Sequence, residues 1–150
     1  MKDMHNDILA KLLFGPVVLA ADNTPAALDM KGSRASAFLI CVGVGGITFD
    51  ATNKIEFKLT HSDTDSNYVA VTAADVEIIM PNGTKGVVGS GGIVRELIAA
   101  HAAATITKVG YIGNKKFRKM LADFSGTHGT GTPIAVLELL GALDRAPAGV

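Results

Sequence analysis

The last third of the chain, residues 109–147, constrains the fold more than any other stretch. An alternating run, residues 112–124, and an apolar run, residues 134–143, flank a segment in which Gly126, Gly129 and Gly131 are interspersed with threonine and histidine. Enough of the first run alternates between polar and apolar residues to predict an extended strand. Two strands joined by about seven glycine-rich residues predict a β-hairpin.

The rest of the chain repeats this pattern of short apolar runs separated by turn residues. No strand–helix–strand rhythm is present, so we predict an all-β, antiparallel β-sandwich or jelly roll of about eight strands, forming one domain over residues 17–150. The runs that predict its other strands are Val17–Ala21, Ala37–Val44, Lys54–His61, Tyr68–Thr72, Val76–Met80, Ile93–Ala100 and Ile106–Tyr111.

The N-terminal segment, residues 1–16, is predicted to be an arm or a short helix outside the sandwich. Asn6 can cap a helix that continues through Leu13, and Gly15-Pro16 would end it. A secretory signal is not expected, because Lys11 interrupts the apolar stretch and acidic residues occupy the region where basic ones are needed.

Composition leaves two explanations open for the apolar character of the chain. Apolar residues make up 48% of it and charged residues 19%, and tryptophan is absent. In Ala37–Val44 both faces of the predicted strand are apolar, so this strand is central or covered on both sides. Either both sheets are well buried within one chain, or a partner covers part of the surface.

No motif points to catalysis, a cofactor or a metal. The glycine segment 126–131 lacks the Gly-Lys-Ser/Thr ending of a phosphate-binding loop. Asp63, Asp65 and Asn67 alternate as in a calcium loop, but the required glycine and glutamate are missing. The four histidines lie in separate segments, and the single cysteine, Cys41, sits in an apolar run. We therefore expect no enzyme, with no catalytic, cofactor-binding or metal-binding residues.

The densest basic stretch, residues 114–119, does not predict a nucleic-acid site. On a strand it would place Lys116 and Arg118 on one face, and only Phe117 could stack on a base. The formal net charge of zero gives no general attraction to nucleic acid. A polar strand face, or a patch that meets an acidic protein surface, fits the stretch better.

Several segments together resemble a family of capsid decoration, or cement, proteins of tailed bacteriophages, encoded near the major capsid gene. The most specific segment is Gly-Tyr-Ile-Gly-Asn-Lys-Lys-Phe-Arg at 110–118. The others are Lys31-Gly32-Ser33, Ala37-Phe38, Lys54-Ile55-Glu56-Phe57, His61-Ser62-Asp63, Phe124-Ser125-Gly126-Thr127, Leu140-Gly141-Ala142 and Ala146-Pro147. The resemblance implies a jelly-roll-like sandwich on the capsid surface of the virion, made in the cytoplasm of a bacterial host.

The resemblance also implies partners: the major capsid protein, whose neighbouring subunits the protein would clamp, and other copies of itself in a homodimer or homotrimer. Neither a nucleic acid nor a membrane is expected as a partner. We expect Leu12, Leu13 and Phe14 to anchor an N-terminal arm, with Lys116 and Arg118 also at an interface. Deleting residues 1–14 should then weaken shell binding without unfolding the sandwich. A tail or head–tail joining protein and a carbohydrate- or cell-surface-binding sandwich remain as alternatives.

Overall fold

The computed structural model describes residues 7–143, and confirms an all-β sandwich of antiparallel strands. Ten strands are present where about eight were expected, two of them only two residues long. They are β1 (Ile8–Leu19), β2 (Leu28–Asp29), β3 (Ser33–Val42), β4 (Lys54–Ser62), β5 (Val69–Ala70), β6 (Val76–Ile79), β7 (Ile93–Leu97), β8 (Thr105–Tyr111), β9 (Phe117–Ser125) and β10 (Thr132–Leu143).

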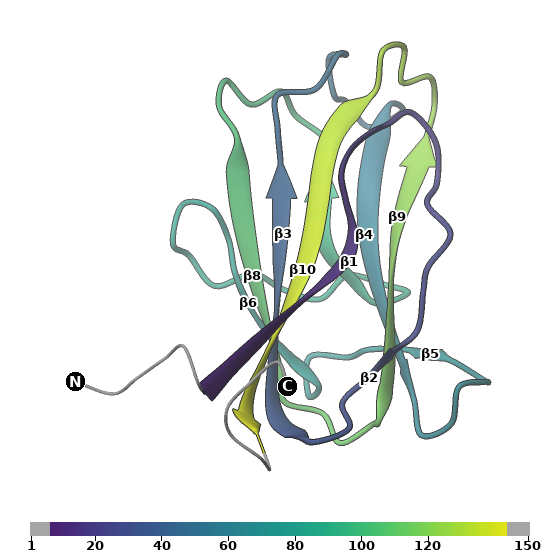
Figure 1. Cartoon of the computed structure of the whole chain (residues 1–150). Coiled ribbons are helices and arrows are strands. Elements are labelled where there is room, and N and C mark those ends of the chain that lie inside the picture. The colour runs from purple at the N-terminus through teal and green to yellow at the C-terminus, as the bar shows by residue number, and fades with distance from the viewer. Residues whose placement is uncertain (1–6, 144–150) are drawn as a thin grey trace.

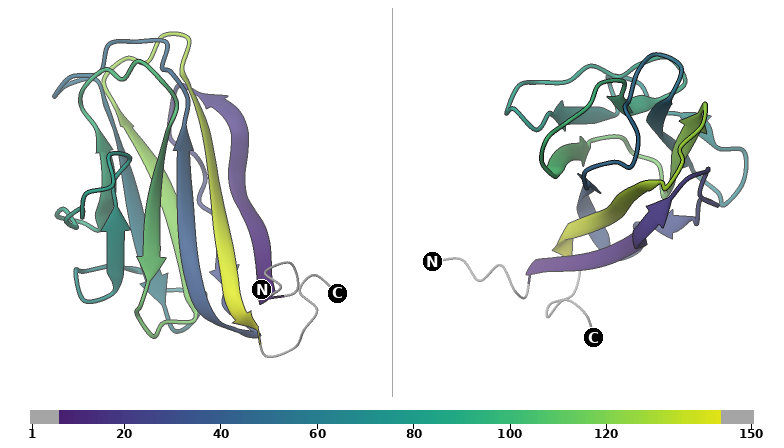
Figure 2. Two further views of the ribbon diagram at one scale, coloured as in Figure 1. Left: turned by 90° about the vertical axis from the view of Figure 1, so that its left-hand side faces the viewer. Right: turned by 90° about the horizontal axis from the view of Figure 1, so that it is seen from above.

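The strands form two layers (Figures 1 and 2). Sheet A has the order β1-β10-β3-β8-β6, and sheet B has the order β2-β9-β4-β5, with β7 also paired to β4. The strands predicted at Lys54–His61 and Tyr68–Thr72 form a hairpin, because Thr60 pairs with Ala70 and His61 with Val69. The described residues contain no helix that is long and apolar enough to cross a membrane.

The predicted N-terminal helix is wrong over the described residues. Residues 8–19 form β1, which pairs with β10 from Ile8 opposite Gly141 to Leu19 opposite Thr132. The helix-like apolar spacing is compatible with this strand, because register shifts after Leu12 and Phe14 change which residues face inward. Residues 8–16 are therefore part of the sandwich, whereas the proposed cap Asn6 lies outside the described residues.

Gly15-Pro16, expected to end a helix, lies instead within the second irregularity of β1. The φ of Gly15 is +82°, and a Cβ there would lie 2.2 Å from the carbonyl oxygen of Ile134. Only glycine fits so close to the neighbouring strand. Pro16 is tolerated because β1 is an edge strand of sheet A, where a missing N–H need not break a ladder.

The predicted hairpin between the last two strands is also wrong. β9 pairs with β2 and β4 in sheet B, whereas β10 pairs with β1 and β3 in sheet A. The glycine-rich segment 126–131 therefore carries the chain from one sheet to the other. Both strands exist as expected, but alternation reveals which residues face inward and not which strand lies alongside.

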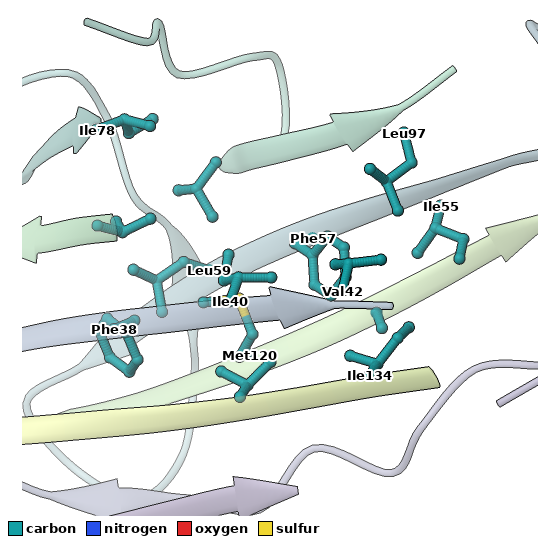
Figure 3. Packing of buried hydrophobic residues seen from close by; sticks show 14 of the residues in the cluster. Phe38, Ile40, Val42, Ile55, Phe57, Leu59, Ile78, Leu97, Met120 and Ile134 are labelled. Atoms are coloured by element: carbon teal, nitrogen blue, oxygen red, sulfur yellow. The ribbon is translucent and has the colours of Figure 1, made fainter. Parts of the chain in front are cut away.

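The core fills the space between the sheets (Figure 3). Alternate residues of each central strand point into it, so that β3 contributes Phe38, Ile40 and Val42. Sheet B contributes Ile55, Phe57 and Leu59 from β4 and Met120 from β9. The absence of tryptophan is compensated by these aliphatic and phenylalanine side chains, which interdigitate across the two layers.

Candidate interaction surface

The outward-facing residues of sheet A form a nearly uncharged surface, which we call the sheet-A face. Strand pairing arranges them in rows, because residues opposite one another share a side of the sheet. The rows are Ala10–Leu139–Ala37–Gly110–Glu77, Leu12–Leu137–Leu39–Lys108–Ile79, Ala135–Cys41–Ile106 and Val18–Pro133. Lys108 and Glu77 are the two charged residues of this set, and both lie on the β8–β6 side.

Solvent reaches the sheet-A face in the described structure. Leu12 is 55% exposed, Ile106 56% and Val18 57%. An apolar hollow of about 330 Å³ opens between Cys41, Ile106, Pro133 and Ala135. Cys41 lines this hollow and is only half-buried, and partial burial raises the pKa of its thiol. β3, which was expected to be central or covered on both sides, is the central strand of sheet A, and this chain covers it on its inner side alone.

The outer face of sheet B has the opposite character. Lys58 contacts Asp123 and lies 3.0 Å from Glu56, while Lys54 contacts Glu56 and lies 3.5 Å from Glu96. The hydrogen bond to Asp123 raises the pKa of Lys58, and the hydrogen bond from Lys54 lowers that of Glu56. A linked set of ion pairs is typical of a face that stays in water. The two faces of one sandwich therefore differ sharply in polarity.

The five predicted interface residues do not gather at one place. Leu12 lies on the sheet-A face, but Leu13 and Phe14 pack against the core. Lys116 precedes β9, is 52% exposed and lies 3.5 Å from Asp29. Arg118 is fully buried, so its assignment to an outer surface is wrong. Its inward direction follows from strand parity, since it shares the inner side of β9 with Met120.

Arg118 takes part in a buried ion pair that connects the two sheets. Its Nε lies 2.9 Å from Oε1 of Glu138 on β10, and its Nη2 contacts the same oxygen. Ser36 donates a hydrogen bond to that oxygen as well. The guanidinium carbon lies 5.2 Å from the ring centre of Tyr111 and 6.0 Å from that of Phe38. Sequence reasoning missed Glu138, although a single acidic residue inside the apolar run 134–143 was a usable signal.

A second polar contact between the sheets lies beside this ion pair. Nδ1 of His61 on β4 lies 2.9 Å from the hydroxyl of Tyr111 on β8, and the amide of Lys115 donates to that hydroxyl at 3.0 Å. The remaining hydroxyl hydrogen can be donated to a neutral His61 ring. Burial lowers the pKa of His61 from its ordinary value; the charges of Asp75 and Asp63 oppose this to a smaller extent, and the charge of Lys115 adds to it.

The free energy of unfolding should therefore fall as the pH drops below about 6.5, the ordinary pKa of histidine. Above that value His61 is neutral in both the folded and the unfolded protein. Below it the unfolded chain takes up the proton more readily than the folded one, which favours unfolding. The loss of stability levels off once the pH lies below the pKa of His61 in the folded protein. Urea midpoints at pH 7, 6 and 5 measure this slope. His61→Asn keeps an acceptor near Nδ1 but cannot be protonated, so its slope should be smaller. Equal slopes in both proteins would contradict this account.

Other residues considered for chemistry serve structural roles. His101 and His128 both pack on the ring of Phe49, with centroids 5.8 and 6.3 Å away. Asp63 pairs with Lys115 at 2.5 Å, and Asp65 accepts a hydrogen bond from the hydroxyl of Tyr68 at 2.6 Å. Among residues 7–143 no three histidine, cysteine or acidic side chains are grouped to hold a metal ion.

Comparison with known proteins identifies no relative of this chain. No family model matches the chain, and searches of curated proteins and of solved structures find no match. The sheet-A face, the ion-paired face opposite it and the sequence resemblance are therefore the grounds for a functional proposal.

Proposed function

We propose that this chain is a non-enzymatic structural protein of a phage virion, a decoration protein that binds the outer surface of the capsid and stabilises it by clamping neighbouring major capsid subunits. The observation that carries the assembly role is the contrast between the apolar sheet-A face and the ion-paired face of sheet B, whereas the capsid as the target comes from the sequence resemblance. A protein whose function is assembly needs a surface that becomes buried and no reactive group. The resemblance across residues 31–147 supports the same function.

A second copy of the chain is the proposed occupant of the sheet-A face. Interfaces that form and dissociate are about as apolar as ordinary surface, whereas homodimer interfaces are more apolar. The rows from Ala10 to Glu77 and from Leu12 to Ile79 contain only one charged residue each, as expected for a homodimer interface. An apolar face that stayed exposed to solvent would also promote aggregation, and a second copy that covers it prevents this.

The area of the sheet-A face reaches the lower end of the range for a specific dimer. Five strands about 4.8 Å apart, with up to about seven residues of each at about 3.4 Å per residue, give a footprint of roughly 500 Å² per copy. Two copies would bury about 1,000 Å², the lower limit for a specific interface. Because the same face is used by both copies, the packing is two-fold, which favours the dimer among the expected oligomers.

The capsid contact then lies outside the sheet-A face. Lys116, half-exposed beside Asp29, remains a candidate for it. Many copies on one shell can each bind weakly and still remain attached through avidity. Deleting residues 1–14 no longer tests this contact cleanly, since it removes much of β1 and the core contacts of Leu13 and Phe14.

The decisive experiment is co-sedimentation of the purified protein with expanded capsids that lack it, followed by heating of the shells. We expect saturable binding and a higher disruption temperature. Shells already saturated with the protein are the control and should take up no more. Absence of binding would contradict the decoration role, and rings formed in solution would then favour the tail or joining alternative.

A further inference from the structure

A small hollow at the open edge of the sandwich combines a cation with an apolar wall. It lies where the turn after β6 meets β7 of sheet B and the start of β8 of sheet A. Its volume is about 280 Å³, and its lining residues are Met80, Pro81, Asn82, Thr84, Arg95 and Thr105. The hollow lies beside the sheet-A face, since Thr105 lines both this hollow and the apolar hollow of that face, but most of its lining comes from the turn after β6.

Arg95 is the unusual residue of this hollow. Its Nε is buried and has no hydrogen-bond partner in the described structure, and no acidic side chain there forms an ion pair with it. Burial lowers the pKa of its guanidinium, because it removes part of the water around the charge. Arg118, by contrast, has Glu138 as its partner. A half-buried cation without an anion is costly, and such charges are normally paired.

Thr105, which also lines this hollow, has a second unsatisfied polar group. Its Oγ1 is buried and has no hydrogen-bond partner among the described residues. The neighbouring acidic groups are engaged elsewhere: Glu96 lies near Lys54, and Glu77 lies 3.7 Å from Lys85. Within the turn, Oδ1 of Asn82 accepts hydrogen bonds from the amide and the hydroxyl of Thr84. One cation and one hydroxyl are thus left for a ligand.

We propose that this hollow binds a single carboxylate group, held by the guanidinium of Arg95 and the hydroxyl of Thr105. A planar carboxylate accepts two parallel hydrogen bonds from a guanidinium, and Thr105 can donate a third. Met80 and Pro81 would contact the methyl or methylene group next to it. A phosphate fits less well, because its second charge would need a further cation. The proposal does not depend on the capsid role, since it concerns the isolated chain.

The test follows the Nε–H resonance of Arg95 by NMR during titration of the full chain with sodium acetate, against sodium chloride at equal ionic strength. We expect a saturable shift with acetate, with a dissociation constant in the millimolar range, and none with chloride. The Nε–H resonance of Arg95 is assigned as the one that is missing from the spectrum of Arg95→Gln. An acetate response that does not saturate, or that chloride reproduces, would overturn the proposal.

Thermal unfolding gives a second measurement that does not depend on one resonance. At acetate concentrations about tenfold above the dissociation constant, the Tm of the wild type should rise by about 2–5 °C relative to chloride. Arg95→Gln should show no such rise, and Lys85→Gln, which removes an exposed lysine, should respond as the wild type does. Equal shifts in wild type and Arg95→Gln would contradict specific binding.

Two sources could supply the carboxylate, and the shell experiment distinguishes them once acetate binding is established. An acidic side chain of a neighbouring protein predicts that Arg95→Gln binds shells at least about tenfold more weakly, and that acetate competes with the wild type. A free small carboxylate predicts unchanged shell binding by the variant. If the chain does not bind shells at all, the decoration role fails while the acetate titration still decides this proposal.

Discussion

Replacing Arg118 with methionine should lower the free energy of unfolding by about 3–5 kcal/mol, because it leaves the carboxylate of Glu138 buried without its cation. Both side chains are fully buried, and Oε1 of Glu138 accepts from Arg118 and from Ser36. Oε2 of Glu138 has no partner among the described residues, so no second donor can replace the lost one. Urea unfolding followed by far-ultraviolet circular dichroism measures the loss.

The matched control is the double variant Arg118→Met/Glu138→Leu. Replacing both ions by apolar side chains of similar size removes the unpaired charge, and such replacements are often neutral or stabilising. The double variant should therefore recover most of the stability lost in Arg118→Met. A single variant as stable as the wild type, or a double variant no better than the single, would show that this pair does not connect the sheets energetically.

The sandwich itself could be predicted because alternation along a strand is a local property. β8 alternates between buried and half-buried or exposed residues, and β4 does so except at Glu56 and Ser62, which are buried as well. The predicted ends of both strands lie within one residue of the observed ends. Partner choice is not local. The residues of β9 and β10 follow one another in sequence, yet each finds its neighbours in a different sheet. Nothing in the loop 126–131 distinguishes a hairpin from a connection between sheets.

β1 shows how tertiary pairing overrides a local helical signal. Ile8, Leu9, Leu12 and Leu13 have helical spacing, but the unpaired edge of β10 offers backbone hydrogen bonds along the whole segment. The two register shifts then let Leu12 face outward while Phe14 faces the core. Sequence alone could not supply those shifts, because they depend on the opposing strand.

The sequence predicted part of the candidate interaction surface. Two apolar faces in the strand around Leu39 indicated a strand that is central or covered on both sides. Only the structure shows that the chain covers one side, and that Leu137, Leu12 and Leu39 stand in one row on the other. Arg118, by contrast, was placed on a surface because basic residues usually lie there. Its partner Glu138 lies 20 positions away and on the opposite sheet.

The sheet-A face should hold the dimer together, so Leu39→Glu should raise its dissociation constant by about 100-fold or more. Leu39 lies in the middle row, between Leu137 and Lys108, so it falls well inside the proposed interface. A two-fold interface contains the substitution twice, and both new carboxylates would be buried. Within a monomer the new carboxylate stays in water beside Lys108, so the fold should tolerate it.

Leu121→Glu is the control, because it makes the same change on the opposite face. Leu121 is half-buried on β9 and lies opposite Lys58, as Leu39 lies opposite Lys108. Light scattering coupled to size-exclusion chromatography should give twice the single-chain mass for wild type and Leu121→Glu, and the single-chain mass for Leu39→Glu. A monomeric wild type, or dissociation by both variants alike, would exclude the sheet-A face as the dimer interface. Dimers retained in Leu39→Glu would also exclude it, since burying two new carboxylates in the interface is costly even with Lys108 beside each.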